Sequence, residues 1–440
     1  MPRIVTDASR YVLLIIMALY TFDAYLSIRS GSSRRSRSLL YMRQNILMFF
    51  FIAVGYTVLF ANSRSFFYLL EALILFLYFA VFIILFVKIL PDSSRLLFNH
   101  MLMLMSIGFL IQSRLSSGYF IKQLIMASFG MALFFIIAFL FKSGERIDRF
   151  AFLFAITGLM MLLLVAVLGR IEYGAKLSLR IGPISFQPIE FVKILFSLFL
   201  AAGLCQADKN KSKMFSFAIF MISLLHILIL MANRDLGGAG IIFVIMAGIY
   251  YVWSGNILII IGSGAALASS LILLSTVFSH ISTRITAWVD PLSHFETSGY
   301  QMCQSLFAIS SGSWFGTGLL KGVPERIPVV SKDFVFSAIS EEMGGLFAII
   351  LIFLCVSCFI LIMNISVVTR SGFDRLLASG LGISYGFQLF LSIGGVIKFI
   401  PSTGVTLPFI SYGGSSLMAS FITFSIIQGM YSARPERRKK

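Results

Sequence analysis

The chain has 440 residues, of which 58% are hydrophobic and 12% are charged, and its formal net charge is +17. Soluble globular domains carry about 25% charged residues, so this composition excludes an ordinary water-soluble protein. In a bilayer every backbone polar group must be paired within the protein, which leaves helices or closed barrels. The apolar runs are long and continuous rather than alternating, and they predict an all-α polytopic membrane protein.

About thirteen apolar runs approach the roughly 20 residues that a membrane-spanning helix needs. The fourth gives the weakest signal, because it is short and ends in Gln112, Ser113 and Arg114. In chain order the runs are 11–28, 45–62, 66–90, 98–113, 119–141, 151–169, 188–206, 214–232, 236–253, 257–278, 334–364, 376–399 and 405–431.

Basic residues gather in alternate connections between these runs. Cytoplasmic loops are enriched in Lys and Arg, so the pattern predicts a cytoplasmic C-terminus and, with an odd number of spans, an extracytoplasmic N-terminus. The same pattern explains the positive net charge, so we do not expect nucleic acid as a partner. Basic loops also suit contact with anionic membrane lipids. The residues are Arg29, Arg34, Arg35, Arg37, Arg43, Lys142, Arg146, Arg149, Lys209, Lys211, Lys213, Arg370, Arg375, Arg434, Arg437, Arg438, Lys439 and Lys440.

Two long connections then face outward, from about residue 170 to 187 and from about 279 to 333. The second contains Trp288, Phe307 and Trp314. A disordered segment would not be so aromatic. We therefore expect a large folded extracytoplasmic loop that lies on the outer membrane surface.

Ionisable residues inside or at the ends of spans are costly, which makes them candidates for function. Asp333 opens the eleventh run at its predicted outer end, where it is either a functional carboxylate or an acid that complements the helix dipole. Glu341 and Glu342 lie two turns further along and need partners, for which Arg284 or Lys398 could serve. Structural ion pairs within the bundle are the simpler interpretation of these two acids.

Three further segments combine polar residues with helix breakers. Glu190 and Lys193 begin the seventh run behind Pro188, and their i, i+3 spacing lets them pair. Asp235 gives the ninth run a similar charged start. The segment 401–416 interrupts the helical pattern, and its paired glycines flanked by hydroxyls suit either an anion or sugar contact or a simple turn with close helix packing.

Gly344 and Gly345 follow the two acids of the eleventh run and permit a kink or a close helix approach. The sequence contains no P-loop, GxSxG or HExxH motif, so any chemistry must use carboxylates and basic groups, either alone or with a divalent ion. Many spans, interrupted helices and buried charges also suit a transporter.

In their order along the chain these motifs resemble the SEDS family (shape, elongation, division and sporulation), whose members include FtsW, RodA and SpoVE, with FtsW slightly favoured. The resemblance divides the chain into an N-terminal addition of about three helices with an arginine-rich cytoplasmic loop (1–97), a ten-helix SEDS core (98–431) and a basic tail (432–440). The matching segments are 186–193, 234–237, 290–306, 312–318, 333–344 and 401–416.

The resemblance implies a peptidoglycan glycosyltransferase that polymerises lipid II on the outer face of the bacterial cytoplasmic membrane, for cell division or cell shape. It implies Asp333 as the catalytic residue, and as the carboxylate that would hold a divalent cation, Mg²⁺ or Mn²⁺, with no organic cofactor. The implied partners are a class B penicillin-binding protein and the division or elongation machinery. A flippase for the lipid-linked precursor and a non-catalytic scaffold that activates the penicillin-binding protein stay as alternatives.

A pyrophosphate leaving group needs cations. One displacement with one base leaves no covalent sugar and should invert the anomeric centre. The predicted cations are Lys176, Arg180, Lys193, Arg284 and Lys332, with Arg284 and Lys193 preferred. Further substrate contacts are expected from Glu190, Gln301, Ser411, Gly413, Gly414 and Ser415, and supporting roles from Glu341, Glu342, Asp235 and Pro188.

The chain departs from the family pattern in its outer segments. Pro328 is followed by Val329-Val330-Ser331-Lys332 where the family usually has Glu-x-(His or Gln)-Thr. Leu177-Ser178 replaces an Arg-Trp pair, and His294-Phe295 stands where a second Asp-Pro is common. These departures affect donor and acceptor contacts, and they keep the scaffold alternative open.

Overall fold

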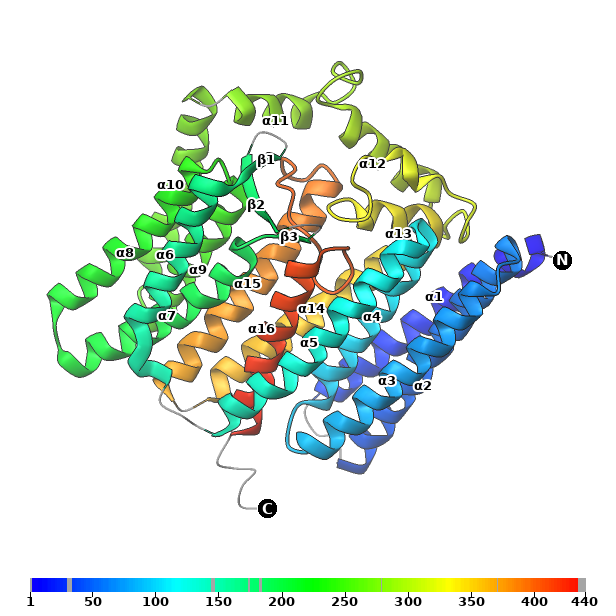
Figure 1. Cartoon of the computed structure of the whole chain (residues 1–440), viewed down its shortest axis with the longest axis horizontal. Helices are drawn as coiled ribbons and strands as arrows, with labels where there is room; N and C mark the ends of the chain where they lie inside the picture. Colours follow the sequence, from blue (N-terminus) through cyan, green and yellow to red (C-terminus); the bar gives the residue numbers. More distant parts are fainter. Residues whose placement is uncertain are drawn as a thin grey trace.

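The computed structural model describes residues 2–29, 34–143, 147–172, 175–181, 184–277, 279–369 and 371–433. Long tilted helices form a bundle, and short helices and a small sheet cover one end of it (Figure 1). The first helix begins at this covered end, and the last helix ends at the opposite one (Figure 1).

The N-terminal helices form one side of the bundle, drawn in blue in Figure 1. The first packs on the second and on α14 (Gly345–Val368), and the second packs on the third and on α4 (Arg95–Leu115). The three helices are α1 (Pro2–Ile28), α2 (Arg34–Ser63) and α3 (Phe67–Ile89).

The rest of the bundle follows in chain order. α16 packs along α5, and α15 packs on α7, α9 and α14. The elements are α5 (Ser117–Ser143), η1 (Ile147–Phe150), α6 (Ala151–Leu168), α7 (Ile189–Asn210), α8 (Lys213–Ala232), α9 (Leu236–Ser254), α10 (Ile257–Val277), α15 (Gly372–Val396) and α16 (Gly414–Ser432).

Among the described residues, eleven helices are long and apolar enough to cross a membrane, namely α1 to α9, α14 and α15. The other two predicted runs are the helices α10 and α16, which do not reach that standard over their described residues. The chain is thus a polytopic α-helical membrane protein, but the predicted count of thirteen spans is not confirmed.

Helix α4 is buried along its whole length, unlike its neighbours α3 and α5, which expose much of their surface. Its polar end therefore faces protein rather than lipid. Gln112 Nε2 donates to the carbonyl oxygens of Ser331 at 3.0 Å and Ile410 at 3.3 Å. The weak hydropathy of the fourth run thus reflects a central position in the bundle.

The predicted single span over 334–364 is wrong, because two helices occupy it. The short helix α13 (Val335–Met343) ends at Gly344, and α14 starts at Gly345. Gly344 has φ +94°, and a Cβ atom there would lie 2.4 Å from the backbone nitrogen of Gly316. The glycine therefore ends the helix rather than kinking it, since only glycine adopts this conformation freely at such close backbone contact.

We expect Gly344→Ala to lower the free energy of unfolding by at least about 2 kcal/mol, from the positive φ and the backbone clash. Thermal unfolding in detergent measures the change. Gly264→Ala on α10 is the matched control, because nothing lies within 4 Å of the added Cβ. Equal melting temperatures for the two variants would contradict this account of the break.

The covering layer contains the two long connections. As expected, the segment 279–333 is folded, and it holds α11 (Ser279–Val289), α12 (Tyr300–Gly312) and η2 (Pro324–Arg326). The segment 170–187 was not predicted to be extended, yet it forms an antiparallel sheet of β1 (Arg170–Glu172), β2 (Ala175–Ile181) and β3 (Ile184–Phe186). The alternation of apolar and polar residues along β2 is the signal that would have predicted it.

The basic connections share one end of the bundle. Helices α1, α3, α5, α7 and α14 all finish at the end opposite the covering layer (Figure 1). Arg146, Arg370 and the tail from 434 to 440 lie outside the described residues. The described connections thus have the arrangement expected when their basic residues face one side of the membrane.

Candidate active site

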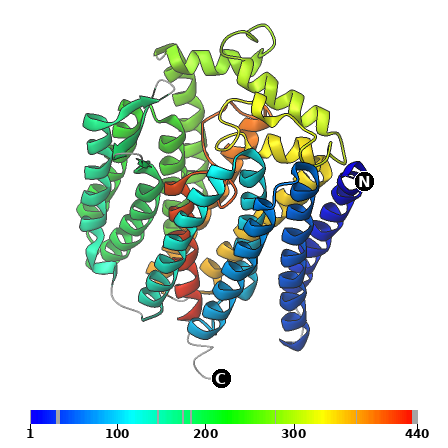
Figure 2. The same ribbon diagram turned by 45° about the vertical axis from the view of Figure 1, so that its right-hand side comes forward.

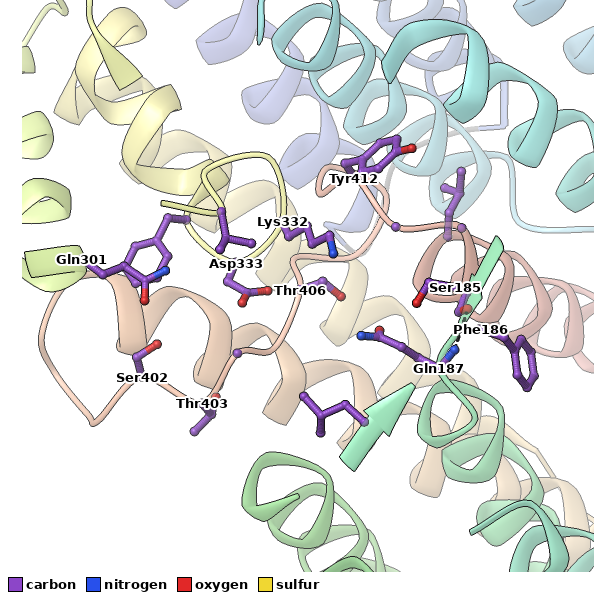
Figure 3. A pocket seen from close by; sticks show the side chains of 18 of the residues that line it. Ser185, Phe186, Gln187, Gln301, Lys332, Asp333, Ser402, Thr403, Thr406 and Tyr412 are labelled. Atoms are coloured by element: carbon purple, nitrogen blue, oxygen red, sulfur yellow. Dashed lines mark hydrogen bonds between the residues drawn. The ribbon is translucent and has the colours of Figure 1, made fainter. Parts of the chain in front are cut away.

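A cavity of about 1100 Å³ lies between the covering layer and the bundle. Its walls come from the N-terminal part of α5, from β3, α11 and α12, from the loop before α13, and from the segment that leads into α16. Figure 3 shows Asp333, Lys332 and Gln187 among the side chains that line it.

Asp333 lies on the loop between η2 and α13, and its carboxylate points into this cavity (Figure 3). Within the described part of the chain, the carboxylate makes no hydrogen bond and no salt bridge. Burial raises the pKa of Asp333 to about 6, and the positive charges of Lys332 and Arg284 oppose that rise. A carboxylate of this kind is a proton acceptor near neutral pH that is not committed to a structural contact.

Backbone contacts on its N-terminal side fix the position of Asp333. The Ser331 carbonyl accepts from Gln112 Nε2 at 3.0 Å and from the Tyr412 amide at 2.8 Å. The Lys332 carbonyl accepts from Ser411 Oγ at 2.5 Å, and this hydroxyl in turn accepts from the Leu407 amide at 2.9 Å. Ser411 does not line the cavity, so it holds the loop that carries Asp333 instead of making the predicted substrate contact.

Two of the predicted cations reach the cavity. Lys332 adjoins Asp333, and Arg284 extends from α11, where its Nη1 lies 3.4 Å from the Ser402 carbonyl oxygen. Burial lowers the pKa of the Arg284 guanidinium, and the carboxylates of Asp235 and Asp333 oppose that change. Arg284 is thus a partly buried cation whose charge acts on the candidate base.

The other preferred cation, Lys193, does not line the cavity. It is buried on α7, where Nζ lies 2.7 Å from Glu190 Oε2 and 2.6 Å from Gln388 Oε1. The i, i+3 ion pair forms as the spacing predicts, and each of the two charges is neutralised by the other. The predicted substrate contacts at Glu190 and Lys193 are therefore corrected to structural roles.

This ion pair supports the cavity wall indirectly. Gln388 Nε2 donates to the Thr406 carbonyl at 3.0 Å, and the Thr406 hydroxyl lies 2.7 Å from Ser416 Oγ. The chain of contacts joins α7, α15 and α16 through the 401–413 segment. Pro188 directly precedes α7, as predicted for the first turn of a helix.

Two more basic residues of the sheet region were predicted to contact substrate phosphate. Lys176 Nζ instead donates to the Ala166 carbonyl at 2.6 Å, and neither Lys176 nor Arg180 lines the cavity. Lys176 lies on β2, and the contact ties that strand to the end of α6. We therefore correct its role to a structural one.

Asp235 caps the N-terminus of α9, where its Oδ1 accepts from the Gly238 amide at 2.8 Å. Burial raises the pKa of Asp235, and the Gly238 amide opposes that rise. The side chain lies close enough to Arg284 for the two charges to interact. The predicted supporting role thus corresponds to a helix cap whose negative charge also acts on Arg284.

The predicted partners of Glu341 and Glu342, Arg284 and Lys398, are wrong. Arg114 of α4 pairs with Glu342, with Nε 2.7 Å from Oε1, and also contacts Glu325. Glu341 Oε1 accepts from the Val323 amide at 2.9 Å. Because α13 is a separate short helix, its acids face α4 and the η2 segment.

The remaining predicted contacts come together at the cavity. Gln301 lines it and donates to the Pro328 carbonyl at 2.9 Å. Gly413, Gly414 and Ser415 line it where α16 begins, and Ser415 Oγ accepts from the Gln187 amide at 3.0 Å. The paired glycines thus lie against the cavity as well as at a helix start.

The sequence analysis missed Lys122 and Gln123, which line the cavity from α5, whereas Thr403 belongs to the segment 401–416 that it did single out. Gln123 is only 3% exposed, and neither of its amide atoms has a hydrogen-bond partner among the described residues. Thr403 Oγ1 is likewise buried and unpaired within that part of the chain. Such groups are normally satisfied, so these atoms leave unused hydrogen-bonding capacity in the wall of the cavity. Lys122 and Gln123 stand side by side in the otherwise apolar run 119–141, and this pattern could have marked them as candidates.

Residues 92–434 match the family model of the FtsW/RodA/SpoVE cell cycle proteins. A peptidoglycan glycosyltransferase RodA from Mycobacterium leprae is 32% identical over 340 residues, which are 72% of this chain and 71% of that protein. A probable peptidoglycan glycosyltransferase FtsW from Aeromonas salmonicida is 32% identical over 279 residues, 62% of this chain and 71% of that protein.

Solved structures share the fold. The rod shape determining protein RodA from Thermus thermophilus superposes with a TM-score of 0.59 at 24% identity, over 78% of this chain and 98% of that one. A chain of a peptidoglycan synthase complex gives a TM-score of 0.66 at 23% identity, over 78% and 99%. With the family match over most of its length, this chain belongs to the FtsW/RodA/SpoVE family.

Proposed function

We propose that this chain is a peptidoglycan glycosyltransferase that polymerises lipid II at the outer face of the bacterial cytoplasmic membrane. One observation supports the proposal most directly. Asp333 projects into a cavity of about 1100 Å³ with no hydrogen bond from the described residues, and Arg284 and Lys332 lie beside it. The relatives named as peptidoglycan glycosyltransferases support the same reaction.

Asp333 acts as the general base. It accepts the proton of the acceptor hydroxyl while that oxygen attacks the anomeric carbon of the donor sugar. The bond from this carbon to the pyrophosphate oxygen breaks, and undecaprenyl pyrophosphate leaves. Because a single displacement leaves no covalent sugar on the protein, the anomeric centre inverts.

Arg284 and Lys332 stabilise the leaving pyrophosphate. Negative charge builds on its oxygens as the bond breaks, and cations fixed beforehand in a partly buried cavity stabilise it best. Arg284 is the stronger candidate, because it is partly buried and its hydrogen bond to the Ser402 carbonyl orients it.

A divalent cation fits the site only if substrate phosphates and water supply most of its ligands. The described residues contain no cluster of three or more His, Cys, Asp or Glu side chains, so no all-protein cage is formed. Mg²⁺ is commonly held by one or two carboxylates together with substrate phosphates and water. Asp333 would supply that carboxylate, and the ion would add positive charge near the pyrophosphate.

The orientation follows from the basic connections at one end of the bundle. If that end is cytoplasmic, the C-terminus is cytoplasmic, the N-terminus is extracytoplasmic, and the cavity opens at the outer face, where lipid II carries its sugars. One matched structure comes from a complex described as coordinating polymerisation and crosslinking. The corresponding partner for this chain is a class B penicillin-binding protein within the division or elongation machinery.

The pH dependence of polymerisation should follow Asp333. Its pKa is raised to about 6, so the carboxylate becomes protonated, and loses its function as a base, as the pH falls below that value. We expect kcat to be constant above pH of about 7 and to fall roughly tenfold per unit well below 6. Initial rates across this range measure it, and a rate independent of pH down to about 4 would contradict the assignment.

The decisive experiment uses purified protein and fluorescent lipid II, with and without the purified penicillin-binding partner. Glycan chains resolved on a gel support the proposed function. Transfer of lipid II across vesicle membranes without chain formation would instead identify a flippase. A protein that makes no chains and transfers no lipid II, but raises the crosslinking activity of the partner, would instead be a scaffold.

A further inference from the structure

The N-terminal helices precede the family match, which starts at residue 92, and they do not line the cavity. Helix α1 nevertheless reaches the segment 313–322, here called the α12–η2 loop. Figure 2 shows the start of α1 beside the yellow segment that follows α12. This places an element outside the family core against the layer that carries the candidate base.

Three side chains of α1 contact this loop. Arg10 Nη1 donates to the Gly316 carbonyl at 2.8 Å. Asp7 Oδ1 lies 2.6 Å from Lys321 Nζ. The ring of Tyr11 packs on Phe315 with centroids 5.4 Å apart. A charged hydrogen bond, an ion pair and an aromatic contact thus join α1 to the loop.

The α12–η2 loop is in turn bonded to the C-terminal end of α13. The Thr317 amide donates to the Glu341 carbonyl and the Gly318 amide to the Glu342 carbonyl, both at 2.9 Å. A Cβ atom on Gly316 would lie 2.3 Å from the Glu342 carbonyl oxygen, so the two backbones touch. Helix α13 has nine residues and begins two positions after Asp333, so it links the loop at its C-terminal end to the base at its N-terminal end.

Helix α1 is itself anchored in the bundle. The Tyr20 hydroxyl lies 3.3 Å from His100 Nδ1, and His100 Nε2 lies 3.0 Å from Ser357 Oγ. These buried contacts connect α1 to α4 and α14. Near its start, the Thr6 hydroxyl lies 3.1 Å from Asn62 Oδ1 of α2. The helix therefore holds the loop from a fixed position.

We propose that α1 is a built-in brace of the active site, in which Arg10 and Asp7 are positioning residues that hold the α12–η2 loop and, through α13, keep Asp333 directed into the cavity. The consequence for catalysis rests on the proposed glycosyltransferase function. Since the brace touches no substrate, its loss lowers kcat and leaves KM unchanged.

The test uses full-length protein and two readouts. The variants are Arg10→Met, Asp7→Lys, Lys321→Asp and the double charge reversal Asp7→Lys/Lys321→Asp. The control is Tyr25→Phe, which removes another contact of α1, the hydrogen bond of its hydroxyl to the Phe353 carbonyl at 3.0 Å, away from the loop. Hydrogen exchange of the Thr317 and Gly318 amides is measured without substrate, and kcat and KM with lipid II.

We expect Arg10→Met to speed both amide exchange rates and to lower kcat by about tenfold, the size typical of a charged hydrogen bond. Each single charge reversal should act by about two- to fivefold, because this pair is partly exposed. The double reversal should restore both quantities, and Tyr25→Phe should match the wild type.

Unchanged exchange in all variants would overturn the brace, and so would a double reversal as impaired as the single ones. The amide exchange rates test whether α1 holds the loop even if the wild-type protein makes no glycan. In that case the proposed function fails, and the exchange rates alone decide whether α1 holds the loop.

Discussion

Asp333→Asn should lower the rate of glycan polymerisation by about 10²- to 10⁴-fold, the usual contribution of a general base. The amide keeps the shape of the side chain but cannot accept the proton. Because the carboxylate makes no hydrogen bond within the described part of the chain, its loss should leave folding intact. Gel analysis of products from fluorescent lipid II measures the rate, and thermal unfolding confirms the fold.

Glu296→Gln is the matched control for this variant, since Glu296 is an exposed acid of the same covering layer that does not line the cavity. It should polymerise like the wild type. The residual activity of Asp333→Asn should also lack the loss of rate below pH of about 6. A folded Asp333→Asn protein with wild-type rates would refute the assignment of the base.

Arg114→Met should destabilise the protein by about 3–5 kcal/mol, which is typical when one partner of a buried ion pair is removed. Arg114 is buried between Glu342 and the Gly322 carbonyl, and Glu342 is only 1% exposed. The substitution leaves that carboxylate without its cation. Thermal unfolding in detergent measures the effect.

Two further variants test the reason for this loss. Adding Glu342→Gln to Arg114→Met should recover part of the stability, because it removes the uncompensated charge. Lys88→Met on α3 replaces an exposed cation and should change stability by less than about 0.5 kcal/mol. If Arg114→Met unfolds like Lys88→Met, the pair contributes little to the fold.

The sequence singled out Asp333 at the junction of an aromatic loop and an apolar run, both visible in one dimension, and the family resemblance favoured its functional interpretation; the structure has this residue in the cavity wall. The sequence could not identify Arg114 as the partner of Glu342, since 228 positions separate them and hydropathy does not say which helices meet. The predicted partner Arg284 was reasonable by charge alone. Its true position beside Asp333 depends on how α11 lies across the bundle.

Lys193 shows a second limit of prediction from the sequence. Its spacing from Glu190 predicted their pairing, and the pair is present with 2.7 Å between Nζ and Oε2. The same spacing could not tell whether the pair faces the cavity or the interior. In the structure Lys193 also bonds Gln388 of α15, which keeps the pair inside the bundle. Local periodicity does not predict such contacts between helices that are distant in sequence.

The complete burial of α4 has a consequence for how the chain enters the membrane. A helix with Asn99, His100 and Arg114 in its length is poorly soluble in lipid by itself. Two of its polar partners are synthesised earlier, since Asn99 bonds Gln44 at 3.1 Å and His100 lies 3.3 Å from the Tyr20 hydroxyl. The early helices thus offer this span a polar docking face at the moment it leaves the insertion machinery.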